Sequence, residues 1–145
     1  CHLWFQNRIA IFIFGIPGHI LTLDKGAEIP YIRLMEIIFI EIPEFVNKID
    51  KIASDAEMRE LQYELIKNPY KGKIVKGTGG ARKIRMKFKG KGKSGGARVI
   101  YYYVDLQGEI WLLDIFLKSE KKDLSENEKK NLYRFIKEKI HGSFN

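Results

Sequence analysis

Cysteine is almost absent from this chain, which has one, Cys1, among its 145 residues. A single cysteine excludes an internal disulfide framework and any zinc site built from cysteine ligands, and it favours a reducing, cytoplasmic setting. Histidine is also scarce: His2, His19 and His141 do not stand at metal-ligand spacing with one another or with carboxylates. We therefore predict no metal site and no cofactor.

Acidic residues are missing from a long central segment. No Asp or Glu occurs between Glu64 and Asp105, although twelve lysines and arginines lie there, and the whole chain carries a formal net charge of +8. The C-terminal part of the chain, by contrast, mixes both signs. A confined and uncompensated block of cations predicts an anionic partner such as nucleic acid.

Long hydrophobic runs are lacking as well. The most apolar stretch, residues 9–23 (IAIFIFGIPGHILTL), is interrupted by Pro17 and Gly18 and is shorter than the roughly 18 apolar residues that a membrane-spanning helix requires. We therefore predict no membrane anchor. Because the chain begins with Cys and not Met, we interpret residues 1–34 as a non-native N-terminal extension upstream of a true start at Met35. Residues 35–145 would then form the folded domain.

From residue 35 onward the pattern predicts an α+β domain. Residues 35–42 are rich in β-branched and aromatic side chains and indicate a strand, and Pro43 suits the first turn of a following helix. Ser54 and Glu57 have the spacing of a capping box, which predicts the start of a second helix.

The rest of the domain is predicted to be a sheet followed by a C-terminal helix. Three segments have strand character, namely RKIRMKFK (82–89), ARVIYYYV (97–104) and EIWLLDIFL (109–117). The near-continuous apolar character of the last segment predicts a central strand covered on both faces. Ser125 and Glu128 form a second capping box before the last helix. The predicted fold is thus an antiparallel twisted sheet with an N-terminal strand, two helices and a C-terminal helix.

The segment 82–89 alternates between apolar and basic residues. Ile84 and Met86 point to one face of the predicted strand, and Lys83 and Arg85 point to the other. With tyrosines on the neighbouring strand, such a face suits RNA, because cations neutralise phosphates and tyrosine rings stack on bases. The alternative is that the lysines form a solvated surface and the tyrosines fill the core. The pattern alone leaves both interpretations open.

Several stretches, taken in order, closely resemble one protein family. GTGGARKIR, GKGKSGGARVIYYY and LKSEKKDLS are similar to motifs of the RelE/HigB toxins of bacterial type II toxin–antitoxin modules, and the resemblance covers residues 35–140. It implies a RelE-like fold and a ribosome-dependent, metal-free endoribonuclease that enters the decoding site and cuts messenger RNA. It also implies a cognate helix-turn-helix antitoxin as a partner.

The resemblance further implies which residues carry out the reaction. The predicted catalytic residues are basic and lie on or beside the strands: Lys83, Arg85, Arg98, Lys118 and Lys121. Arg98 is expected to stabilise the phosphate. For RNA binding we add the hairpin lysines and one tyrosine: Lys87, Lys89, Lys91, Lys93 and Tyr102. The family's C-terminal tyrosine would lie near Ser125, which is predicted to be a helix cap, so the general base is left unassigned.

Two alternatives are left open. A ParE-like toxin of the same fold inhibits DNA gyrase and has no catalytic set of cations. The ribonuclease is favoured by the cations retained at Lys83, Arg85, Arg98 and Lys118. A non-catalytic RNA-binding module would bind RNA in a salt-sensitive manner and would cleave nothing.

Overall fold

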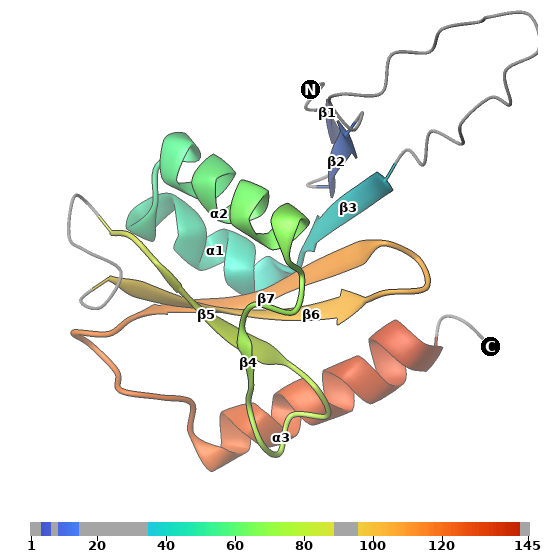
Figure 1. Ribbon diagram of the computed structural model, residues 1–145. Coiled ribbons are helices and arrows are strands. Elements are labelled where there is room, and N and C mark those ends of the chain that lie inside the picture. The colour runs from blue at the N-terminus through green and yellow to red at the C-terminus, as the bar shows by residue number, and fades with distance from the viewer. Residues whose placement is uncertain (1–3, 7–8, 15–34, 89–95, 143–145) are drawn as a thin grey trace, which may run out of the picture.

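The computed structural model describes residues 4–6, 9–14, 35–88 and 96–142, and these form an α+β arrangement. A mixed sheet separates the helices into two layers (Figure 1). Helices α1 (Pro43–Ile52) and α2 (Asp55–Lys67) lie on one side of the sheet, and α3 (Glu126–Phe135) lies on the other. A π-helical segment, Ile136–His141, continues α3.

The strands occur in the sheet in the order β1-β2-β3-β7-β6-β5-β4. Their bounds are β1 (Trp4–Gln6), β2 (Ile9–Phe14), β3 (Met35–Glu41), β4 (Lys73–Ile74), β5 (Arg82–Met86), β6 (Ala97–Val104) and β7 (Glu109–Leu117). β3 pairs with β7 in parallel, so the prediction of a purely antiparallel sheet is wrong. Parallel neighbours need a long crossover connection, and the helices α1 and α2 with the strands β4 to β6 supply it.

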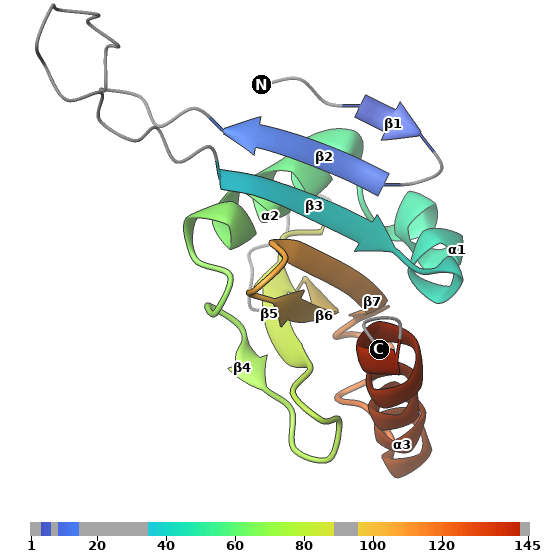
Figure 2. The same cartoon turned by 90° about the vertical axis from the view of Figure 1, so that its right-hand side faces the viewer.

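Two strands come from the part of the chain that precedes residue 35. β2 pairs with β3 in antiparallel register from Ile9 opposite Ile40 to Phe14 opposite Met35, and β1 pairs with β2. Figure 2 shows β2 beside β3 and β1 beyond β2 at one edge of the sheet, and β4 forms the opposite edge. Strand pairing does not report where translation starts, so the assignment of residues 1–34 to a non-native extension stays a prediction.

The helix starts follow the local sequence signals. The Ser54 side chain accepts a hydrogen bond from the Glu57 amide, and the Glu57 carboxylate accepts one from the Ser54 amide. Ser125 and Glu128 repeat this reciprocal pattern at the start of α3. Both predicted capping boxes are therefore confirmed. They form because the first backbone amides of a helix have no partner within the helix, and these side chains supply the missing acceptors.

The core is centred on β7, which lies between β3 and β6. Its residues 112–116 are all buried, which confirms the predicted central strand. Phe45 of α1 is fully buried in the core on one side, and on the other the ring of Phe135 lies 6.0 Å from that of Trp111. Within the described residues, no helix is both long enough and apolar enough to cross a membrane.

Candidate functional site

The register of β5 and β6 places two arginines directly opposite each other. Arg85 pairs with Arg98, one step from the β5 end at Met86. The Arg85 side chain is exposed, whereas Arg98 is only 6% exposed. Arg85 alternates with the buried Ile84 and Met86, as the period of two predicts. The two guanidinium groups therefore share one face of the sheet.

A cavity of about 530 Å³ opens beside this arginine pair. Its lining is predominantly basic and comes from α2, the loop before β4, the strands β4, β5 and β6, and the residue after β7: Glu64, Lys71, Gly72, Lys73, Lys83, Ile84, Arg85, Arg98 and Lys118. Four of the five predicted catalytic residues thus border one cavity.

Burial lowers the pKa of Arg98, and the positive charge of Arg85 lowers it further. The Arg98 guanidinium also donates a hydrogen bond to the Ala97 carbonyl at 3.2 Å. Two opposed like charges are stabilised by an anion placed between them, because each arginine then gains an opposite charge and a donor–acceptor contact. The arginine pair therefore favours an anion at the cavity.

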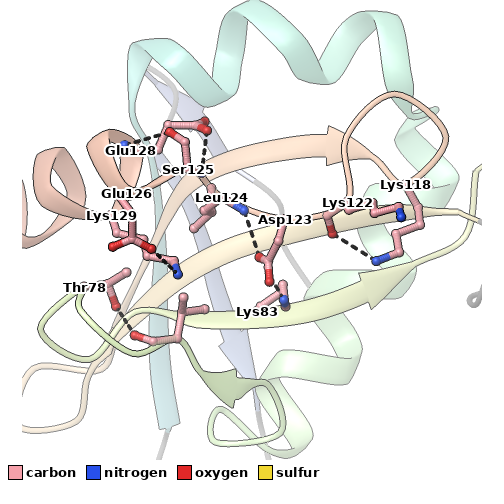
Figure 3. Close-up of polar contacts among 11 residues, drawn as sticks. Thr78, Lys83, Lys118, Lys122, Asp123, Leu124, Ser125, Glu126, Glu128 and Lys129 are labelled. Carbon is pink, nitrogen blue, oxygen red and sulfur yellow. Dashed lines mark hydrogen bonds and ion pairs between the residues drawn. The ribbon is translucent and has the colours of Figure 1, made fainter.

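Two of the four lysines that line the cavity, Lys83 and Lys118, are held by oxygen atoms of the segment before α3 (Figure 3). The Lys83 Nζ lies 3.0 Å from Asp123 Oδ1, and the Lys118 Nζ donates to the Lys122 carbonyl at 2.9 Å. Burial by itself would raise the pKa of Asp123, but hydrogen bonds from Lys83 and from the Leu124 amide, with the charge of Lys83, hold that pKa below its usual range. Both ammonium groups are thereby oriented at the cavity wall.

Lys121, the fifth predicted catalytic residue, is not one of the described residues that line the cavity. Its ammonium group pairs with the Glu128 carboxylate and lies 4.9 Å from the centre of the Phe116 ring. Burial acts to raise the pKa of Glu128, yet the hydrogen bonds from Lys121 and Ser125 bring it below its usual value. The same carboxylate completes the capping box of α3, so the Lys121 ammonium group is held at the N-terminus of that helix.

The predicted RNA-binding residues are spread over different surroundings. Lys87 Nζ lies 3.1 Å from Glu60 Oε1, and the hydroxyl of Tyr102 lies 2.8 Å from His141 Nε2. Neither Lys87 nor Tyr102 is among the described residues that line the cavity. Three of the predicted lysines lie outside the described residues: Lys89, Lys91 and Lys93.

Sequence reasoning missed the part of the cavity lining that comes from α2 and the loop after it. Glu64 of α2 forms an ion pair with Lys71, with 2.5 Å between the carboxylate and ammonium atoms. Gly72 is fastened by the hydroxyl of Tyr101, which accepts from the Gly72 amide at 2.9 Å and donates to the Pro69 carbonyl at 2.8 Å. The available signal was the basic turn NPYKGK between the second helix and the next strand, which we counted only as charge.

Tyr101 is fully buried, so for this tyrosine the core-filling alternative is confirmed.

Within the described part of the chain, no group of three or more His, Cys, Asp or Glu side chains could hold a metal ion. No model of a known protein family matches the chain.

Proposed function

We propose that this protein is the toxin of a type II toxin–antitoxin module and a metal-free endoribonuclease that cuts messenger RNA on the ribosome in the cytoplasm. One observation carries the proposal. The four cations Lys83, Arg85, Arg98 and Lys118 were identified from the resemblance to RelE/HigB toxins, and they line a single cavity around a directly opposed arginine pair.

The proposed reaction is a transesterification within the RNA. The ribose 2′-oxygen attacks the adjacent phosphorus and loses its proton, the bond from phosphorus to the 5′-oxygen breaks, and the departing oxygen gains a proton. The products are a 2′,3′-cyclic phosphate and a 5′-hydroxyl. Negative charge grows on the non-bridging oxygens in the transition state, and groups already oriented toward that charge lower the barrier most. Arg85 and Arg98 have this role.

The lysines have a supporting role in this proposal. Lys83 and Lys118 add positive charge at the sides of the phosphate site, where an ammonium group can also stabilise the leaving oxygen. The general base is not assigned. A helix-turn-helix antitoxin is the proposed partner, and it would neutralise the toxin.

Arg85→Ala tests the proposal most cleanly, because the Arg85 side chain is exposed and its loss leaves no buried partner behind. We expect cleavage of messages on programmed ribosomes to fall by about a hundredfold or more, the usual effect of removing one donor to a developing oxyanion. Arg134→Ala is the matched control, since it removes an exposed arginine from α3. It should cut at the wild-type rate.

Primer extension on messages recovered after expression supplies the readout. Cuts in register with codons, each leaving a 5′-hydroxyl, support the ribonuclease. Gyrase-linked DNA breaks without cuts in messages would point instead to a ParE-like toxin, and RNA binding without cleavage would point to a non-catalytic module. Undiminished cleavage by Arg85→Ala would remove the arginine pair from the mechanism.

A further inference from the structure

A surface that combines an aromatic ring with a cation lies next to the basic cavity. Tyr70 immediately precedes three residues that line the cavity, Lys71, Gly72 and Lys73. Tyr70 itself is exposed, with 52% of its surface accessible to solvent. Its ring contacts Arg82 and Tyr103. We refer to Tyr70, Arg82 and Tyr103 together as the Tyr70 cluster.

The contacts of the Tyr70 cluster hold an exposed ring in one orientation. The Tyr70 hydroxyl donates to Asp105 Oδ2 at 3.2 Å, and the Tyr103 ring meets the Tyr70 ring edge to face with their centres 5.2 Å apart. The Arg82 guanidinium carbon lies 5.2 Å from the centre of the Tyr70 ring. A side chain fixed in this way loses little rotamer entropy when it binds a ligand.

Arg82 also forms hydrogen bonds with the backbone of residues 70–72, which connects the Tyr70 cluster to the cavity. Its guanidinium donates to the Tyr70 carbonyl at 3.1 Å and to the Gly72 carbonyl at 2.8 Å. The ring of Tyr70 and the Lys71–Lys73 wall are therefore held by the same side chain. A ligand that reaches from the cavity to Tyr70 meets cations along its path and an aromatic ring at the end.

We propose that the Tyr70 ring stacks on the base of a nucleotide that flanks the phosphate in the cavity. This inference rests on the proposed ribonuclease function and adds a binding subsite to it. An RNA strand fits both parts of the surface, because its phosphates match the basic wall and every base offers a face for stacking on an aromatic ring. Arg82 strengthens the platform through its own cation–π contact.

The remaining tyrosines of β6, Tyr101 and Tyr102, do not offer such a platform beside the cavity. Tyr101 is fully buried, and Tyr102, the tyrosine predicted from the sequence, is joined to His141 through its hydroxyl. Tyr133 is nearly as exposed as Tyr70, at 49%, but lies on α3 against the turn at Gly79. It therefore serves as a matched control.

Single-turnover cleavage of a synthetic message on programmed ribosomes tests the subsite. We expect Tyr70→Ala to cut about tenfold more slowly at subsaturating protein, in keeping with the loss of one base–aromatic stack. Tyr70→Phe keeps the ring and should stay within about twofold of the wild type, as should the control Tyr133→Ala. Circular dichroism spectra and unfolding curves check that each variant is folded.

A series of messages, each with one abasic nucleotide near the cut, identifies the stacked base. The penalty of Tyr70→Ala should vanish on the message that lacks that one base and persist on the others. An equal penalty on every message would show that Tyr70 acts through the fold, and a wild-type rate for Tyr70→Ala would also overturn the subsite. Failure of the wild type to cut any message would overturn the proposed function itself, which is a distinct result.

Discussion

Replacement of Tyr101 by Phe would remove the hydroxyl that contacts Gly72, a residue of the cavity lining, and would leave the ring in place. The hydroxyl of this fully buried tyrosine donates to the Pro69 carbonyl and accepts from the buried Gly72 amide. Each hydrogen bond contributes about 1 kcal/mol net, and an amide left buried without its partner costs about 1–3 kcal/mol. We expect the free energy of unfolding to fall by about 2–3 kcal/mol, or by about 5–10 °C in Tm.

Tyr102→Phe is the control for this substitution, since it removes the same atom from the next residue of β6. Its hydroxyl bonds to the exposed His141, where water replaces the lost contact, so the loss should be about 0.5 kcal/mol or less. Urea unfolding followed by circular dichroism gives both values. Amide exchange at Gly72 should also become faster in Tyr101→Phe alone. Equal unfolding free energies for the two variants would refute the view that the Tyr101 hydroxyl fastens this loop.

Two further predictions concern charged groups. The folded pKa values of Asp123 and Glu128 lie below those of the unfolded chain, so their stabilising effect is complete above about pH 4.5 and is lost as the pH falls through the folded values. In urea unfolding series from neutral to acidic pH, Asp123→Asn should therefore lose less stability than the wild type over the acid range, and identical pH profiles would contradict this. Asp114 is a buried carboxylate of β7 that lies 2.6 Å from Lys48 Nζ, and Lys48→Met should cost about 1–2 kcal/mol in the same assay. That value is below the range for a fully buried pair because the Lys48 side chain is 45% exposed, and an unchanged free energy would show that the ion pair adds nothing.

Local signals in the chain predicted the parts of the fold that depend on neighbouring residues. The capping boxes at Ser54 and Ser125 need only a residue three positions further on, so they could be read directly. Two further patterns are equally local. The alternation around Arg85 predicted that its side chain lies outside the core, and the apolar run of β7 predicted that this strand is central.

The candidate site depended on contacts between distant segments, which no local pattern reports. Arg98 is opposite Arg85 because of the β5–β6 register, and Glu64 reaches the cavity because α2 packs beside the sheet. Lys121 belonged to the same basic run as Lys118, yet its pairing with Glu128 directs it elsewhere. A residue's type and spacing are carried by the chain alone, whereas its burial, its partner and its place at the cavity arise only when the strands and helices pack.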